Sequence, residues 1–200
     1  MTQDTADGPP AGPSRRRGGT RQEIVDVAMR LFAERGYDKT SLREIADEVG
    51  VTKAALYYHF RTKDDIVRSA MQSYTDGLIE LVDRAERRPP GTDRNRELVD
   101  GLLELFSTTG GAALRFGQAN PTALSQIHLG EIHLTQLKRL IGLLAGDGAS
   151  AEGTIRAALA FGALVIGVIG GEIELRGSSA ERAQAARTVA LELLAALDPR

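Results

Sequence analysis

The sequence predicts an all-α fold, and three observations support this prediction. Apolar residues recur every three or four positions from Thr20 onward, and no segment alternates convincingly between apolar and polar residues. Capping boxes, in which Ser or Thr stands three positions before an acidic residue, precede several of these segments. Glycine or proline follows most of them. We therefore expect about nine helices and no internal repeat.

Four of these helices are expected in the first ninety residues. The first covers residues 20–36, opens with the capping box of Thr20 and Glu23 and ends at Gly36. Two short helices over residues 41–50 and 52–60 follow, and a long helix begins at Thr62. The proline-containing run at residues 87–91 ends that long helix.

The rest of the chain also shows helical spacing. Gly110 and Gly111 are expected to end one helix, and Asn120 with Pro121 to open another. The helices expected after residue 91 cover residues 98–111, 112–116, 121–146, 150–177 and 178–197.

The composition excludes several classes of site. The 200 residues contain no cysteine, which excludes disulfides, thiolate metal sites and thiol nucleophiles. The N-terminus has no apolar signal-peptide core, and the uncharged run at residues 157–171 is shorter than the roughly 20 residues of a membrane span. We therefore expect a cytoplasmic protein.

The charge is unevenly distributed along the chain. Residues 15–63 contain 11 Lys or Arg and 7 Asp or Glu, whereas residues 64–200 contain 14 and 18. This distribution indicates a polyanionic partner for the first third only. Residues 1–19 are expected to form a disordered tail. Within it, Arg15, Arg16 and Arg17 form either a solvated cluster or an arm that contacts DNA phosphates or a minor groove.

Residues 41–60 have the pattern of a helix-turn-helix. Gly50 can adopt the positive φ of a tight turn, and Ala46 is small where two helices would cross. The outward positions of the second helix, residues 52–54 and 57–59, combine small, hydrogen-bonding and aromatic side chains without an acid. Such a surface suits the major groove of B-DNA. A helical hairpin that serves only as a scaffold is the alternative.

These residues resemble the DNA-binding domain of TetR-family transcriptional repressors. The resemblance rests on Thr40–Ala46, Gly50-Val51, Leu56–Phe60 and Lys63, with the preceding helix and Gly36-Tyr37, and it covers residues 20–66. It implies a helix-turn-helix domain over residues 20–65, with the motif at residues 41–60. A ligand-binding and dimerisation domain would then cover residues 66–200, where the resemblance rests on helix number and length alone.

The resemblance also implies roles for individual residues. Lys53 would read base edges from the recognition helix, and Lys63 would hold a phosphate at the start of the next helix. The residues implied to contact DNA are Thr40, Ser41, Arg43, Thr52, Lys53, Ala54, Tyr57, Tyr58, His59 and Lys63.

Members of this family are homodimers whose last two helices form a four-helix bundle. The glycines of residues 157–171 fall near one helical face, where they would permit close approach of a partner helix. Burial within one subunit is the alternative. The expected interface residues are Gly162, Gly167, Gly170, Leu191 and Leu194.

The middle helices would enclose a pocket for a small, mostly apolar effector, because few polar residues face it. The expected lining residues are Met71, Tyr74, Leu102, Phe106, Phe116, Gln126 and His133. Ordinary core packing is the alternative for each of them. His128 and His133 are five positions apart and do not share a helical face, which argues against a metal site.

The sequence thus predicts a ligand-responsive repressor that binds a palindromic operator as a homodimer and is released by its effector. No cofactor is expected, and no motif supports catalysis, so the protein is not expected to be an enzyme. An activator, or a repressor without an inducer, is the alternative within regulation. An enzyme or ligand carrier on a helical fold is the alternative outside it.

Overall fold

The computed structural model describes residues 17–120, 130–171 and 173–196, and these residues form helices without strands. This confirms the prediction of an all-α fold for the described part of the chain. The nine helices in these ranges are α1 (Arg17–Arg35), α2 (Leu42–Val49), α3 (Lys53–His59), α4 (Lys63–Glu86), α5 (Thr92–Ser107), α6 (Thr109–Ala119), α8 (Gly130–Ala145), α9 (Ala151–Ile169) and α10 (Ser179–Ala195).

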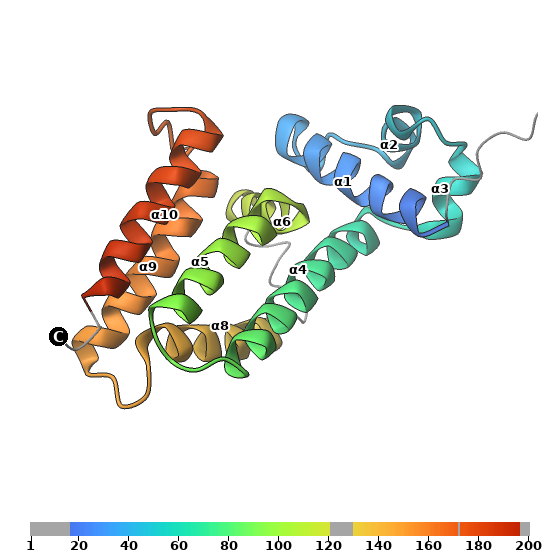
Figure 1. The fold of residues 1–200 in the computed structure, drawn as a ribbon. Helices are drawn as coiled ribbons and strands as arrows, with labels where there is room; N and C mark the ends of the chain where they lie inside the picture. The colour runs from blue at the N-terminus through green and yellow to red at the C-terminus, as the bar shows by residue number, and fades with distance from the viewer. Residues whose placement is uncertain (1–16, 121–129, 172, 197–200) are drawn as a thin grey trace, which may run out of the picture.

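The helices form two groups that α4 connects (Figure 1). α1, α2 and α3 gather at one end of the molecule, and α4 runs from them into the second group. There α4 packs against α5, α6 and α8, while α9 and α10 lie side by side at the opposite end. One hydrophobic core extends through both groups, from Ile24 and Phe60 to Leu98 and Leu164. The two groups are therefore packed as one body.

The predicted capping boxes define three of the helix starts. Ser41, Thr62 and Ser178 each accept a hydrogen bond from the backbone N–H three residues later. The acidic residue at that position accepts the N–H of the cap in return, so two backbone donors are satisfied at each helix start. These boxes confirm the predicted starts of α2, α4 and α10.

The predicted start of the first helix is wrong. α1 begins at Arg17, so Thr20 lies inside the helix and does not cap it. The predicted disordered tail is therefore too long by residues 17–19, and its earlier residues lie outside the described ranges. Two glycines at positions 18 and 19 lower the helix propensity of this turn, so the sequence does not predict that it is helical.

The connection between α5 and α6 also differs from the prediction. Gly110 and Gly111 do not end a helix but lie in the first turn of α6. A Cβ at Gly110 would stand 2.5 Å from the carbonyl oxygen of Leu105, and one at Gly111 would overlap the carbonyl oxygen of Phe106. The glycines therefore permit a corner in which the first turn of α6 lies directly on the last turn of α5.

The predicted helix from residue 150 to residue 177 is also too long. α9 ends at Ile169, and the chain turns at Gly170, where the Leu175 N–H donates to the Gly170 carbonyl at 2.7 Å. By length and composition α9 could cross a membrane, with a mean hydropathy of 1.6. It packs against α5, α6, α8 and α10, and 28% of its apolar window is buried inside the protein. The predicted helix opening at Pro121 lies outside the described residues, and α8 ends at Ala145 as expected.

The α5–α6 corner can be tested with two glycine substitutions. Gly111→Ala should lower the free energy of unfolding by about 1–3 kcal/mol, because the new methyl group overlaps backbone that cannot move aside. Gly142→Ala is the matched control, since nothing lies within 4 Å of a Cβ at this helical position. It should raise stability by about 0.5–1 kcal/mol. Urea unfolding measures both, and equal effects would contradict the tight corner.

Candidate nucleic-acid interface and interior site

The turn between α2 and α3 has the geometry that the sequence predicts. Gly50 has φ +75°, and Val51 donates its N–H to the Ala46 carbonyl at 3.0 Å, which folds the chain back sharply. Ala46 and Leu56 are buried between the two helices, where they fix the angle at which α3 projects. This arrangement is a helix-turn-helix.

α3 presents one face to solvent and buries the other. Leu56 and Phe60 lie in the core, whereas Tyr57 is 43% exposed and Tyr58 82%. Lys53 and Ala54 are also exposed, and α3 contains no acidic residue. An exposed tyrosine with no packing partner in the core costs solubility without adding stability, so this face suits contact with another molecule.

Two ring contacts order side chains on the exposed face. The Lys53 ammonium lies 5.5 Å from the centre of the Tyr57 ring, and the Tyr58 and His59 rings meet edge to face at 5.2 Å. A cation held over an aromatic ring loses less conformational entropy on binding than a free lysine does. Thr52 caps α3 by accepting the Ala55 N–H at 3.1 Å, and its side chain stays exposed.

The start of α2 supports two of the three predicted contacts and contradicts one. Ser41 is exposed, and Arg43 has a side chain that is 81% exposed with a long 3.9 Å ion pair to Asp47. Thr40 is only 1% exposed, and its hydroxyl donates to the Gly36 carbonyl at 2.9 Å. The predicted contact of the Thr40 side chain with a phosphate is therefore wrong, because the hydroxyl ties the end of α1 to the loop.

Lys63 points toward the end of α1. Its ammonium donates to the Tyr37 carbonyl at 2.5 Å and lies 4.4 Å from the centre of the Tyr37 ring. The phosphate contact implied for Lys63 stays a prediction, but the contacts in the structure give this lysine an internal role.

The sequence did not predict a role for Arg21. Its guanidinium lies 4.7 Å from the centre of the Phe60 ring, which places an exposed cation beside the C-terminal end of α3. Helical phase alone places Arg21 on the solvent-exposed face of the first helix, where arginine is common and indicates no particular function. The contact with Phe60 is tertiary and has no signal in local spacing.

Comparison with known proteins agrees with this geometry. The family described as "Bacterial regulatory proteins, tetR family" matches residues 24–70. KstR2, an HTH-type transcriptional repressor of Rhodococcus jostii, is 40% identical over 71 residues, which are 36% of this chain and 35% of that protein. FasR, an HTH-type transcriptional activator of Mycolicibacterium smegmatis, is 34% identical over 102 residues, 48% of this chain and 45% of that protein.

The chain is thus similar to TetR-family regulators over residues 24–70. The solved structure of AmtR from Mycobacterium smegmatis is similar over 96% of this chain and 92% of that one, with a TM-score of 0.68 and 26% identity. The chain spans less than half the length of the two curated relatives above. Their names describe transcriptional regulators, not enzymes, in agreement with the prediction.

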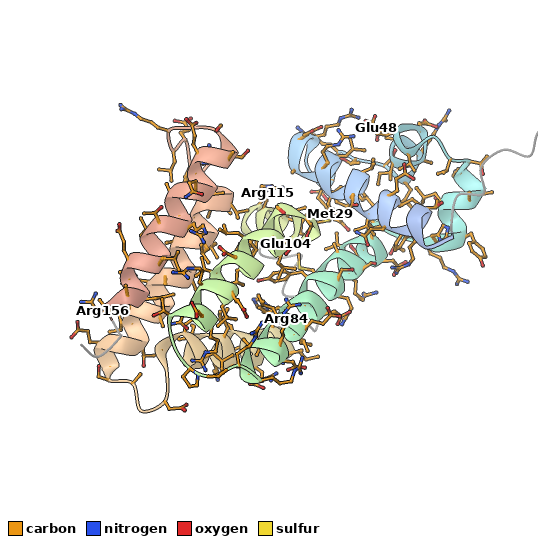
Figure 2. All side chains as sticks on the ribbon, viewed as in Figure 1. Met29, Glu48, Arg84, Glu104, Arg115 and Arg156 are labelled. Carbon is orange, nitrogen blue, oxygen red and sulfur yellow. The ribbon has the colours of Figure 1, made fainter. Side chains whose placement is uncertain are left out.

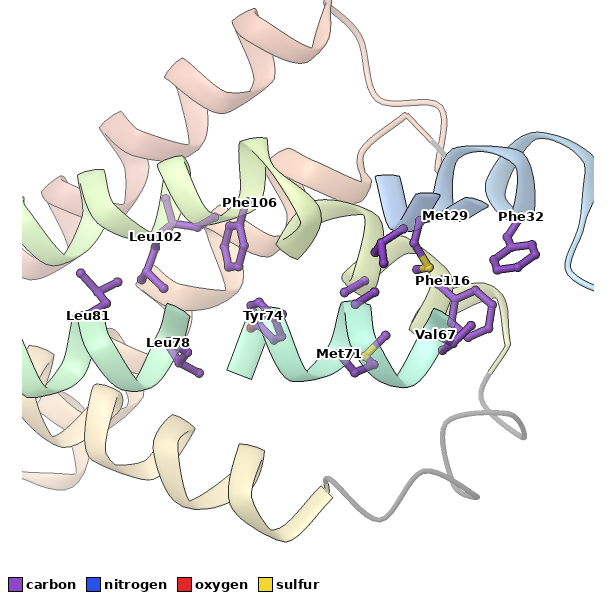
Figure 3. Close-up of a cluster of buried hydrophobic side chains, with 14 of the residues drawn as sticks. Met29, Phe32, Val67, Met71, Tyr74, Leu78, Leu81, Leu102, Phe106 and Phe116 are labelled. Atoms are coloured by element: carbon purple, nitrogen blue, oxygen red, sulfur yellow. The ribbon is translucent and has the colours of Figure 1, made fainter. Parts of the chain in front are cut away.

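The interior of the protein brings four of the predicted pocket residues together. Tyr74 of α4 lies 6.3 Å from Phe106 of α5 and 5.3 Å from His133 of α8, measured between ring centres. Figure 3 shows Tyr74 and Phe106 pointing toward one another, with Leu102 beside them. Phe106 also meets Phe161 of α9 at 6.3 Å, so three helices besides α4 converge on this cluster.

The Tyr74 hydroxyl is the unusual group in the cluster. Tyr74 is 4% exposed, and its hydroxyl has no hydrogen-bond partner among the residues that the structure describes. Burial raises the pKa of Tyr74 to about 12 and lowers the pKa of His133, so both side chains are uncharged at neutral pH. A buried hydroxyl without a partner is costly, and a ligand atom could satisfy it.

One predicted pocket residue does not join the cluster in the structure. Phe116 is wrongly placed by the prediction, because its ring packs on Phe32 and Tyr37 at the far end of α6 (Figure 3). Met71 lies on α4, one turn before Tyr74, and is buried. Gln126 lies outside the described residues, as does His128. Within the described ranges, no group of three or more His, Cys, Asp or Glu could hold a metal ion.

Most of the glycines predicted to lie at the dimer interface instead pack against their own chain. A Cβ at Gly167 would lie 2.7 Å from the Ala186 Cβ of α10, and one at Gly170 would lie 2.9 Å from Arg182 Cδ. Leu194 is 2% exposed, and Leu191 is half-buried against the core. The prediction that Gly167, Gly170 and Leu194 face a partner is therefore wrong, and close packing of α9 on α10 explains them. The interface role of Leu191 stays a prediction. Gly162 differs, with nothing within 4 Å of its Cβ position.

A different face of α9 is exposed and apolar. Ile155, Leu159 and Ile166 are 59%, 55% and 48% exposed, and Gly162 lies between the last two at the same helical phase. Val189 of α10 is 45% exposed and borders a groove that Ile166 also lines. We call the residues Ile155, Leu159, Gly162, Ile166 and Val189 the α9–α10 stripe.

The unpartnered hydroxyl of Tyr74 leads to a stability prediction. Tyr74→Phe should raise the free energy of unfolding by about 1–2 kcal/mol at pH 7, because it removes a buried polar group without a partner. Between pH 10 and 12 the wild type should lose stability that Tyr74→Phe keeps, since the raised pKa of Tyr74 favours the folded state only while the phenol is protonated.

Tyr58→Phe is the control for this measurement. Its side chain is 82% exposed, so its hydroxyl is hydrated in the folded and unfolded states, and urea unfolding should show no change. A Tyr74→Phe protein that is less stable than the wild type would mean that the hydroxyl has a bonding partner.

Proposed function

We propose that this protein is a ligand-responsive transcriptional repressor that binds a palindromic operator as a homodimer and is released by a small, mostly apolar effector. The observation that carries the proposal is the exposed, acid-free face of α3, projected by a sharp turn from a packed domain. The matching curated relatives include the repressor KstR2 and the activator FasR, and their names support a role for this chain in the regulation of transcription.

DNA recognition would use both ends of the helix-turn-helix. Lys53, Ala54 and Tyr58 would enter the major groove, where lysine can donate to guanine and a methyl group can contact thymine. Ser41, Arg43 and Tyr57 would contact the flanking phosphates. Arg21, held beside Phe60, would add a cation at the C-terminal end of the recognition helix.

Dimerisation would cover the α9–α10 stripe. Large aliphatic side chains on one helical face are rarely left open to water in a monomer, and Gly162 in their midst would let a partner helix approach closely. A second copy related by a two-fold axis presents the same stripe and supplies a matching apolar face. The two recognition helices would then read two half-sites, which explains the expected palindromic operator.

The effector would bind at the Tyr74 cluster. Phe106 and Leu102 of α5 and Phe161 of α9 offer apolar contact from two helices, and the Tyr74 hydroxyl offers one hydrogen bond. An effector that binds better to one arrangement of α4 than to another would shift the population of DNA-binding molecules. Tyr74→Phe should weaken an effector that bonds the hydroxyl and should leave operator affinity unchanged in its absence.

The first test is selection of a random duplex pool on the purified protein, followed by anisotropy titration of the selected sequence at several salt concentrations. A palindromic consensus is expected. Arg43→Ala should weaken binding on all sequences and reduce the slope of log affinity against log salt by about 1, because one phosphate contact is lost. Lys53→Ala should instead relax the consensus at one base pair.

Arg84→Ala is the control for charge, because Arg84 is exposed on α4 outside the helix-turn-helix. It should leave the salt slope unchanged. Failure to enrich any sequence, with weak binding that disappears at physiological salt, would contradict the proposed function and leave the interior cluster as the place to search for activity.

The stripe can be tested by placing a charge in it. Leu159→Glu should convert the dimer to monomer in sedimentation equilibrium, since a carboxylate would have to be buried at the interface. Ile132→Glu is the matched control, because Ile132 is 48% exposed on α8, outside the stripe. A dimer that survives Leu159→Glu would show that another surface holds the two copies together.

A further inference from the structure

The helix-turn-helix is attached to the rest of the chain through few elements. Among the described helices, α3 packs extensively only on α2, and α2 packs on α3 and α1, whereas α1 also packs on α4 and α6. Met29 of α1 and Arg115 of α6 lie on the two sides of a groove between these helices (Figure 2). The orientation of the recognition helix therefore depends on where α1 meets α4 and α6.

Three aromatic rings meet at this place. Phe116 of α6 lies 6.1 Å from Phe32 of α1 and 5.4 Å from Tyr37, and Phe32 and Tyr37 meet edge to face at 5.0 Å. Phe32 and Phe116 are each 2% exposed. We call Phe32, Tyr37 and Phe116 the aromatic joint.

Tyr37 extends the joint to the start of α4. Its hydroxyl hydrogen-bonds with the Asp64 carboxylate, its carbonyl accepts from Lys63 Nζ, and its ring lies under the same ammonium. Burial, together with the hydroxyl bond to Asp64, raises the pKa of Tyr37. One residue thus contacts α6 through Phe116, α1 through Phe32 and the first turn of α4 through Lys63 and Asp64.

The other end of α6 lies at the interior cluster. A Cβ at Gly110, in the first turn of α6, would come within 3.0 Å of the Tyr74 ring. α6 therefore spans from Tyr74 at its start to the aromatic joint near its end, and it lies between the proposed effector site and the helix-turn-helix.

From this geometry we infer that Phe116 and Tyr37 are positioning residues for operator recognition. The aromatic joint holds each helix-turn-helix at a fixed angle to the body of its subunit, and it thereby sets the separation of the two half-sites that the dimer accepts. This inference rests on the proposed function. It assigns to Phe116 a role in DNA recognition although Phe116 itself lies inside the protein and touches no DNA.

The test compares operators that differ only in half-site spacing. With the selected operator and versions that carry one base pair more or less at the centre, the wild type should lose about tenfold or more in affinity at the altered spacings. Phe116→Ala should lose about threefold or less, because a loosened joint lets each recognition helix follow its half-site. Phe116→Leu keeps most of the buried volume, so its loss of affinity at the altered spacings should lie between those of the wild type and Phe116→Ala. Tyr37→Phe removes the bond to Asp64 and should also reduce this loss of affinity.

The control removes an equally buried side chain away from the joint. Leu140 is fully buried on α8, which packs on α4, α5 and α9, so Leu140→Ala should destabilise the fold and keep the wild-type spacing penalty. If Phe116→Ala and Phe116→Leu bind more weakly by the same factor at every spacing, Phe116 serves only stability and the inference is overturned. A wild type that selects no operator overturns the proposed function, and the inference with it.

Discussion

The structure depends on how α4 is held at its two ends. At its start, Lys63 bonds to the Tyr37 carbonyl and the capping box of Thr62 and Asp65 closes the first turn. Near its end, Arg139 of α8 bonds to Asp83 at 2.8 Å and to Glu86 at 2.7 Å. α4 is thus tied to the loop after α1 at one end and to α8 at the other, and it is the element that connects the helix-turn-helix with the interior cluster.

Because both ends of α4 are held by these bonds, the two helix groups are mechanically connected to each other. Tyr74 lies between the two ends of α4 and faces α5, and the same helix carries Val67, which packs beside Phe116 (Figure 3). A change of packing around Tyr74 cannot be absorbed by a flexible linker, because no linker separates the groups. It has to be accommodated by α4, α6 or the contact of both with α1.

The features that the sequence predicts correctly are local in the chain. The capping boxes of Ser41, Thr62 and Ser178, the left-handed Gly50 and the open face of α3 all follow from residues within one or two helical turns of each other. The helix-turn-helix could therefore be located to within a residue or two. The all-α class follows for the same reason, since helical periodicity is itself a short-range signal.

The features that the sequence did not predict arise from packing between distant residues. α9 is apolar on nearly every side, so its pattern cannot tell the face that packs on Ala186 from the face that carries Leu159. Phe116 has the helical phase of a pocket residue, and only the position of α6 shows that it meets Phe32. Thr40 lies in a motif that the sequence predicts to be exposed, yet its hydroxyl points into the protein and donates a hydrogen bond to the Gly36 carbonyl.

The α9–α10 stripe has a consequence for how much of the protein a cell needs. In the proposed dimer, the pairing of the stripes and the reading of an operator are consecutive equilibria, so at concentrations below the dimer dissociation constant operator occupancy rises with the square of the chain concentration. A twofold fall in the amount of chain then produces about a fourfold fall in the population of DNA-binding species. Synthesis and degradation of this chain would thus act on transcription as a second input, beside any effector.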